Sequence, residues 1–174
     1  MSLYHDLYPH NQRAFTSVIE HFKTSYKTCV IAAPGTGKTM VGLAVSEHFQ
    51  KKTLFVTYTN DIIEQTKETM ERFSLDLPIQ FVTYDKLIHM STEELDSLDP
   101  ELLILDEFQH SGAPEYTKPI DYLEQKNPFL YVFGLSATPI RDFDFQSYTL
   151  EDGSTAKGKK DMAEQRFHGD VSYT

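Results

Sequence analysis

The chain has 174 residues, a formal net charge of −10, 40% hydrophobic residues and one cysteine. The length suits one domain, or one domain plus a tail, and the acidic balance excludes a protein that holds nucleic acid by bulk positive charge. Short apolar runs exclude a transmembrane helix, and the first residues lack the pattern of a signal peptide. With its single cysteine in a predicted buried strand, we expect a cytoplasmic protein without a disulfide.

Apolar residues recur at helical or strand spacing through most of the chain. In chain order, we predict a helix over 11–22, a strand over 28–32, a helix over 40–49, a strand over 53–58, a helix over 61–73, a strand over 79–83, a helix over 92–98, a strand over 101–105, a helix over 115–125 and a strand over 129–135. Strands alternate with helices, and several strands are continuous apolar runs. Both features are typical of a parallel sheet covered by helices on its two faces.

The last part of the sequence has a different composition. Residues 151–160 are polar, with two glycines and three lysines, which is typical of a solvated loop. The lysines could touch phosphate, but three lysines amid many acids favour a solvated loop. We expect one last strand within 166–174, and we divide the chain into a nucleotide-binding domain over 1–145 and a polar loop with a final strand over 146–174.

The segment Ala32–Thr39, A-A-P-G-T-G-K-T, lies between a predicted strand and a predicted helix. In such a turn, backbone N–H groups and the helix N-terminus converge on an anion. Lys38 can reach the β- and γ-phosphates, and the Thr39 hydroxyl can ligate Mg²⁺. The sequence therefore predicts a nucleoside triphosphate site, with phosphate-binding residues Pro34, Gly35, Thr36, Gly37, Lys38 and Thr39.

Two adjacent carboxylates, Asp106 and Glu107, follow the apolar run Leu103–Leu105. Open α/β sheets place their ligands at this end of the strands. Asp106 can hold Mg²⁺ through water, and Glu107 can polarise the water that attacks the γ-phosphate. An acidic pair that merely opens a loop is the alternative. The position of the pair at the end of a separate strand favours the catalytic interpretation.

A third segment, Gly134–Pro139 (G-L-S-A-T-P), also follows a predicted strand. In order and spacing, A-x-x-G-x-G-K-T, D-E-x-x and S-A-T-P resemble motifs I, II and III of superfamily-two helicases and translocases. The acidic segment looks most like the DEAH-related branch, which includes restriction-enzyme motor subunits. The resemblance extends from about Tyr8 to Pro139. It implies an α/β, three-layer RecA-like P-loop domain, the first of two in the family, which uses ATP and Mg²⁺ with Lys38, Asp106 and Glu107 as catalytic residues.

The same resemblance implies a set of residues that couple ATP hydrolysis to movement: Gln109, His110, Ser136, Ala137 and Thr138. DEAH-type proteins carry histidine at the place of Gln109, and His110 is either a displaced equivalent or a solvated loop residue. D-E-F-Q also occurs in superfamily-one DNA helicases, which are therefore a rival. The short separation of motifs I and II, and the S-A-T segment, favour superfamily two.

Two weaker segments are similar to nucleic-acid-contacting motifs of the family. Val56–Gln65 resembles motif Ia and Thr83–Leu87 resembles motif Ib, which implies backbone contacts for Thr59 and Thr83. Hydroxyls and amides need no net positive charge, so such contacts suit an acidic protein. A plain helix N-cap is the alternative for Thr59. The sequence leaves DNA and RNA both open as the polymer, with DNA favoured.

The segment Leu7–Gln12 resembles the family's adenine-reading segment, L-x-P-x-Q. Aligned without a gap, Asn11 takes the place of the glutamine, whereas a shift of one residue brings Gln12 there. The side-chain amide of either residue could pair with adenine.

No Q-x-x-G-R-x-x-R motif occurs in the sequence. In the family this motif lies on the second RecA-like domain and supplies an arginine finger. We therefore expect a monomeric first motor domain that needs a second RecA-like domain as its partner. Two functions remain: a nucleic-acid motor domain, which the intact Asp106–Glu107 pair favours, and a non-motor nucleotide-binding module that recruits a partner.

Overall fold

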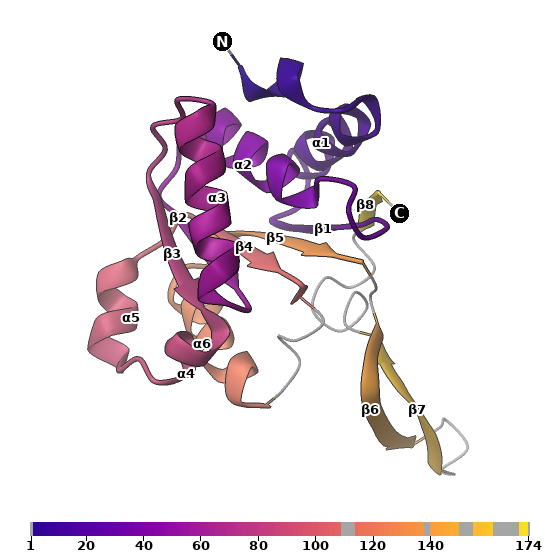
Figure 1. Cartoon of the computed structure of the whole chain (residues 1–174). Helices are drawn as coiled ribbons and strands as arrows, with labels where there is room; N and C mark the ends of the chain where they lie inside the picture. Colours follow the sequence, from indigo (N-terminus) through magenta and orange to yellow (C-terminus); the bar gives the residue numbers. More distant parts are fainter. Residues whose placement is uncertain (1, 109–113, 138–139, 150–154, 162–170, 174) are drawn as a thin grey trace.

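A computed structural model of the chain describes residues 2–108, 114–137, 140–149, 155–161 and 171–173 (Figure 1). Its elements in chain order are η1 (Leu3–Asp6), α1 (Pro9–His21), β1 (Lys27–Ile31), α2 (Lys38–Phe49), β2 (Thr53–Thr57), α3 (Asn60–Arg72), β3 (Ile79–Thr83), α4 (Tyr84–Ile88), α5 (Thr92–Leu98), β4 (Leu102–Asp106), α6 (Pro114–Lys126), β5 (Tyr131–Ser136), β6 (Ile140–Thr149), β7 (Thr155–Asp161) and β8 (Val171–Tyr173).

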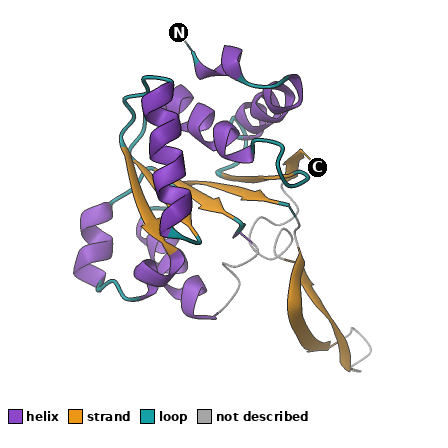
Figure 2. Cartoon of the chain, viewed as in Figure 1, coloured by secondary structure: helices purple, strands orange, loops and turns teal. Residues whose placement is uncertain are grey.

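Six parallel strands form the central sheet, in the order β3-β2-β4-β5-β1-β8. Helices cover both faces of this sheet (Figure 2). Alternate residues of β4 enter different cores, because successive side chains of a strand point to opposite faces. Leu103 and Leu105 pack with residues of α4, α5 and α6, whereas Leu102 and Ile104 pack with residues of α1 and α2. The three-layer α/β fold is confirmed.

The helices and strands predicted over 11–135 are all present, with ends that differ by two residues at most. Two short helices were not predicted, η1 and α4, because each is too short to show a hydrophobic period. Side-chain hydroxyls cap both of them: Ser2 accepts a hydrogen bond from the amide of Tyr4, and Thr83 from the amide of Lys86. The helix α4 proves important, because it begins at the end of β3 beside the candidate site.

The last part of the chain differs from the expectation. Residues 155–160 belong to β7, which forms an antiparallel hairpin with β6, so the expected loop over 151–160 is wrong there. Backbone hydrogen bonds build such a hairpin, so polar side chains do not prevent it. The hairpin projects from the central sheet (Figure 1). The strand β8 pairs with β1 within the range expected for a last strand. The domain boundary at residue 145 stays a prediction.

Close packing of α2 fixes the helix that follows the glycine turn. Gly42 lies in the middle of α2, and a Cβ there would lie 3.1 Å from Leu135 Cδ1 and 3.3 Å from Phe55 Cε2. A larger residue would require these side chains to shift by a few tenths of an ångström, so Gly42 lets α2 lie close against β5 and β2. In the described residues, no helix is long and apolar enough to cross a membrane.

Candidate functional site

Three of the predicted segments meet at the carboxyl ends of β1, β4 and β5. Backbone pairing sets Ile31 opposite Ser136, and Asp106 opposite Leu135. The amide of Ala32 also donates to the carbonyl oxygen of Ser136 at 3.0 Å. The glycine turn after β1 therefore starts beside the end of β5. On the other side of β5 lies β4, which ends in Asp106.

Two glycines with positive φ shape the turn between β1 and α2. Gly35 has a φ of 74° and Gly37 a φ of 80°, a region that other residues rarely adopt. A Cβ at Gly37 would also lie 2.9 Å from Nδ2 of Asn11, so a side chain there would displace the Asn11 amide, which bonds to the turn. Gly37 is the N-cap of the 12-residue helix α2, and no side chain in the described residues caps this helix. Its first N–H groups therefore face the turn, as an anion site requires.

The side chains of the turn fold inward over its own backbone. Lys38 Nζ donates to the carbonyl oxygens of Ala32 and Ala33, both at 3.2 Å. The hydroxyl of Thr36 donates to the carbonyl oxygen of Ala33 at 2.7 Å. Thr39 is half-buried in the first turn of α2. An ammonium group and several backbone N–H groups thus gather at the turn, which gives the arrangement an affinity for anions.

The acidic pair consists of Asp106, whose carboxyl is buried, and Glu107, whose backbone is strained. Asp106 is only 6% exposed, and its Oδ1 accepts a hydrogen bond from the amide of Glu107 at 3.1 Å. Burial, and next the charge of Glu107, raise the pKa of Asp106 to about 7, against the lowering effects of the Glu107 amide and of Lys38. Glu107 has a φ of 47°, which is costly for a residue with a side chain. A cation would relieve the buried charge of Asp106.

The residues expected to couple hydrolysis to movement are only partly described. Ser136 is fully buried at the end of β5, and Ala137 follows it half-buried. Gln109, His110 and Thr138 lie outside the described residues.

The two candidate adenine-reading amides have different partners. Nδ2 of Asn11 donates to the carbonyl oxygen of Thr36 at 2.7 Å and to that of Gly37 at 3.4 Å, and Asn11 is buried. Nε2 of Gln12 instead donates to the carbonyl oxygen of Tyr4 at 3.1 Å. Asn11 therefore supports the glycine turn, whereas Gln12 ties α1 to η1.

A neighbouring histidine, which sequence reasoning missed, contacts the same turn. Nε2 of His10 donates to the carbonyl oxygen of Thr36 at 2.8 Å. The ring of Tyr8 stacks on that of His10, with centroids 5.8 Å apart, and Tyr8 is largely exposed. The sequence signal for the His10 bond and for the Tyr8 stack is that both residues lie in the segment Leu7–Gln12, close to Asn11.

The two candidate nucleic-acid threonines both cap helices. The hydroxyl of Thr59 accepts from the amide of Ile62 at 3.3 Å, and that of Thr83 from the amide of Lys86 at 3.1 Å. Thr59 follows β2 and Thr83 ends β3, so both lie at the same edge of the sheet as the glycine turn. The expected N-cap at Thr59 is present, and contact with a polymer stays a prediction.

Tyr84 connects this edge of the sheet to the acidic pair, and sequence reasoning missed it. Its side chain is fully buried, and its hydroxyl donates to the main-chain carbonyl oxygen of Asp106 at 2.8 Å. The sequence offers two signals, the place of Tyr84 in the segment that resembles motif Ib and its position directly after the strand that ends in Thr83.

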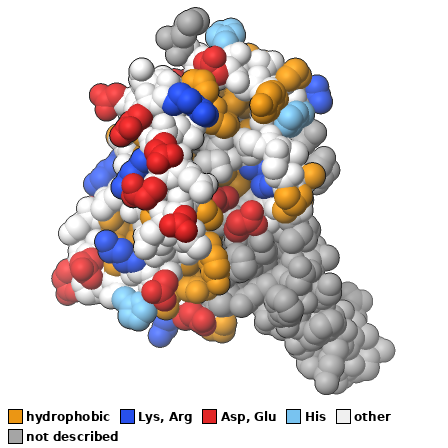
Figure 3. Space-filling view, viewed as in Figure 1, with side chains coloured by type: hydrophobic (Ala, Val, Ile, Leu, Met, Phe, Trp, Pro, Cys, Tyr) orange, Lys and Arg blue, Asp and Glu red, His pale blue; other side chains and the backbone are white. Residues whose placement is uncertain are grey.

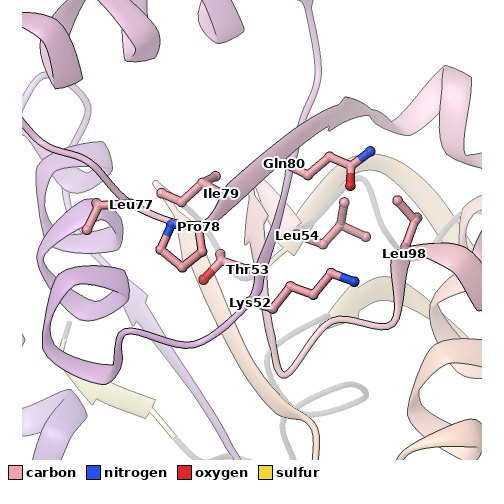
Figure 4. Close-up of a pocket in the computed structure, with 8 residues that line it drawn as sticks. All are labelled: Lys52, Thr53, Leu54, Leu77, Pro78, Ile79, Gln80 and Leu98. Carbon is pink, nitrogen blue, oxygen red and sulfur yellow. The ribbon is translucent and has the colours of Figure 1, made fainter.

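A separate pocket of about 280 Å³ opens at the opposite edge of the sheet (Figure 4). Its lining comes from the starts of β2 and β3 and from nearby loops and α5: Lys52, Thr53, Leu54, Leu77, Pro78, Ile79, Gln80 and Leu98. Because the strands are parallel, their starts lie at the edge away from the glycine turn. This pocket is therefore not part of the candidate site.

Comparison with known sequences gives one family and one curated relative. The family described as "Type III restriction enzyme, res subunit" matches residues 4–78. The "DNA 3'-5' translocase XPB2" of Sulfurisphaera tokodaii is 32% identical over 126 residues, which cover 65% of this chain and 27% of that protein. The chain thus spans about a quarter of the length of this relative.

The solved structures that match this chain include two restriction-modification enzymes. The Type ISP enzyme LlaBIII bound to DNA matches with a TM-score of 0.61 and 16% identity, over 96% of this chain and 15% of that one. A nuclease-deletion mutant of the Type ISP enzyme LlaGI, in complex with a DNA substrate mimic, matches with a TM-score of 0.63 and 17% identity, over 97% of this chain and 20% of that one. At these identities the likeness establishes the fold.

Proposed function

We propose that this chain is a superfamily-two helicase-like motor domain of a DNA translocase, and that it binds ATP with Mg²⁺. The observation that carries the proposal is the meeting of the glycine turn, the Asp106–Glu107 pair and Ser136 at one edge of the sheet. Ligands bind at the carboxyl ends of strands in open α/β sheets, so this edge is where a nucleotide would lie.

The glycine turn would hold the phosphates. Backbone N–H groups at the start of α2 would bind the phosphate oxygens, and Lys38 would exchange its bonds to Ala32 and Ala33 for bonds to the β- and γ-phosphates. Both partners of the lysine are neutral carbonyls, whereas phosphate is charged. A charge-assisted bond is stronger, so the exchange is favourable.

Thr39 and Asp106 would hold the Mg²⁺ ion. The donor set fits, because a hydroxyl in the first turn of α2 and a carboxylate at the end of β4 are the oxygen ligands that Mg²⁺ takes. The burial of Asp106 supports this role, since a buried carboxylate gains more from a neighbouring cation than an exposed one. The ion would neutralise charge on the β- and γ-phosphate oxygens.

Glu107 would orient the water that attacks the γ-phosphate. Glu107 is half-buried, next to Asp106, and its backbone is held at a costly positive φ. Strain of this kind clusters at catalytic positions, where neighbouring contacts enforce one geometry. A general base of this kind contributes about 10²- to 10⁴-fold to a rate.

We propose DNA as the polymer, because the curated relative is a DNA translocase, one of the two solved structures is bound to DNA and the other is in complex with a DNA substrate mimic. Acidic and basic side chains are interspersed on the face shown in Figure 3, and the net charge is −10. Hydroxyls and backbone N–H groups near Thr59 and Thr83 would therefore make the contacts. Movement along DNA would need a second RecA-like domain that closes on the ATP.

We also propose a monomer and a cytoplasmic location, where a thiol such as that of Cys29 stays reduced.

The test is ATP binding by this chain, followed with a fluorescent ATP analogue. Lys38→Ala should weaken binding by at least about 10-fold, because one charge-assisted contact to phosphate is lost. The matched control is Lys67→Ala, which removes an exposed lysine that pairs with Glu64 on α3 and should leave binding unchanged. Equal affinity of the two variants would rule out the nucleotide site.

A further inference from the structure

Tyr84 spans the distance between two strands that are not neighbours. It begins α4, directly after β3, whereas Asp106 ends β4, and β2 lies between these strands in the sheet. The fully buried tyrosine reaches the carbonyl oxygen of Asp106 at 2.8 Å. Its ring also packs against that of Tyr116 on α6, with centroids 5.4 Å apart. The ring therefore has a packing role that is separate from the role of the hydroxyl.

The bonded carbonyl belongs to the peptide group that joins Asp106 to Glu107. The N–H of this same peptide group donates to Oδ1 of Asp106 at 3.1 Å. The peptide group is therefore held at both ends, by the tyrosine hydroxyl at its oxygen and by the carboxylate at its nitrogen. Hydrogen bonds in such a chain strengthen one another, so loss of the hydroxyl would weaken the second bond as well.

The orientation of this peptide group determines where the Glu107 side chain points. Rotation of the peptide plane changes the φ of Glu107, which is 47° and lies in the region that residues with a side chain avoid. Such a conformation persists only where surrounding contacts enforce it. The bond from Tyr84 is a contact of this kind, because it acts on the peptide oxygen directly.

We propose that Tyr84 is a positioning residue for Glu107, which keeps the 106–107 peptide in the orientation that aims the Glu107 carboxylate at the attacking water. The inference rests on the proposed function in one respect, the role of Glu107 in hydrolysis. Tyr84 is fully buried and acts through the 106–107 peptide, so it should affect the rate of hydrolysis and leave the affinity for ATP unchanged.

The experiment compares Tyr84→Phe with Tyr122→Phe in the full chain. Tyr84→Phe removes the hydroxyl and keeps the ring against Tyr116. Tyr122→Phe is the matched control, since its hydroxyl donates to Oδ1 of the exposed Asp96 at 2.7 Å, on other elements. In NMR spectra, Tyr84→Phe should shift the amide resonance of Glu107 and speed its hydrogen exchange, and the control should do neither.

Single-turnover hydrolysis supplies the second measurement. Tyr84→Phe should lower the rate about 10-fold, because a displaced general base loses most of its effect, while the Kd for ATP stays the same. In a Glu107→Gln background, the same substitution should have no further effect on the rate, because both act through one carboxylate. A further fall in that background would overturn the proposal, as would parallel losses of rate and ATP affinity.

The two measurements separate this inference from the proposed function. If the wild-type chain by itself hydrolyses no ATP, the Glu107 amide decides the positioning role alone, and the proposed function is still decided by ATP binding. An unchanged Glu107 amide in Tyr84→Phe overturns the inference whatever the turnover. Should the variant unfold, NMR of the wild-type chain decides instead. A Tyr84 hydroxyl proton that is bonded to the Asp106 carbonyl should exchange with water slowly enough to give a resonance, with contacts to protons of Asp106. A rapidly exchanging hydroxyl proton would overturn the inference.

Discussion

The side-chain amide of Asn11 donates to the carbonyl oxygen of Thr36 at 2.7 Å, which makes a residue of α1 part of the wall of the glycine turn. A second bond reaches the carbonyl oxygen of Gly37, and His10 contacts the same Thr36 oxygen. Three hydrogen bonds from one helix thus hold the backbone that would surround the phosphates. Asn11 therefore has a role in the shape of the turn, whether or not it also reads the base.

Asn11→Ala should weaken ATP and GTP binding to a similar extent, because it loosens the turn that holds phosphate. It should also cost about 0.5–1.5 kcal/mol of stability, because the Thr36 carbonyl loses one hydrogen bond and keeps the one from His10. Binding of both nucleotides and thermal unfolding test this, with Thr16→Ala as the control, which removes an exposed hydroxyl of α1 that donates to the carbonyl oxygen of Gln12. Loss of ATP affinity with GTP affinity retained would instead establish Asn11 as the adenine-reading residue.

The raised pKa of Asp106 predicts that folding stability declines as the pH rises. A carboxyl with a pKa of about 7 in the folded chain binds its proton more tightly there than in the unfolded chain, where the pKa is near 4. Protonation therefore favours folding, and its contribution is complete below about pH 4 and lost as the pH rises through about 7.

Asp106→Asn removes this dependence, since asparagine stays neutral at every pH. In metal-free buffer at pH 8, the variant should be more stable than the wild type by a few kcal/mol, at about 1.4 kcal/mol per pKa unit, and the difference should vanish near pH 4. Urea unfolding at several pH values measures it. Asp96→Asn is the control. A hydrogen bond from Lys126 lowers the pKa of this exposed carboxyl, so the control variant should not be more stable than the wild type at pH 8. A variant no more stable than the wild type at pH 8 would contradict the prediction.

Glu107→Gln should preserve ATP binding and lower single-turnover hydrolysis by about 10²-fold or more, since it removes a general base and keeps the shape of the side chain. Glu64→Gln changes an exposed carboxylate on α3 in the same way and should leave hydrolysis unaltered. Hydrolysis that is unchanged in Glu107→Gln would remove Glu107 as the base.

Binding of DNA by this chain should depend only weakly on salt. Contacts through hydroxyls and backbone N–H groups displace few counterions, so the slope of log K against log salt should correspond to about two phosphates or fewer. Fluorescence anisotropy with duplex DNA and duplex RNA measures the slope and the preference. A steep slope would indicate lysine and arginine contacts, and stronger binding of RNA would exclude DNA as the preferred polymer.

The extent to which sequence predicts structure differs between elements and contacts. The hydrophobic period of the sequence predicts the strands and the long helices. A parallel sheet then predicts that the carboxyl ends of β1, β4 and β5 meet at one edge. The bonds from Asn11 to Thr36 and from Tyr84 to Asp106 join residues 25 and 22 positions apart, on different elements. No local pattern encodes such pairs, because they depend on how helices pack. The pKa of Asp106 likewise depends on burial by residues distant in sequence.

The pairing of β8 with β1 bears on how this domain can be expressed as a smaller unit. Cys29 and Val30 of β1 pair with Val171 and Tyr173, so the strand that leads into the glycine turn has a neighbour on each side. A truncation at residue 145 would turn β1 into an outer strand with unpaired N–H and C=O groups. Such strands recruit other chains into intermolecular sheets. A soluble fragment should therefore extend through residue 173.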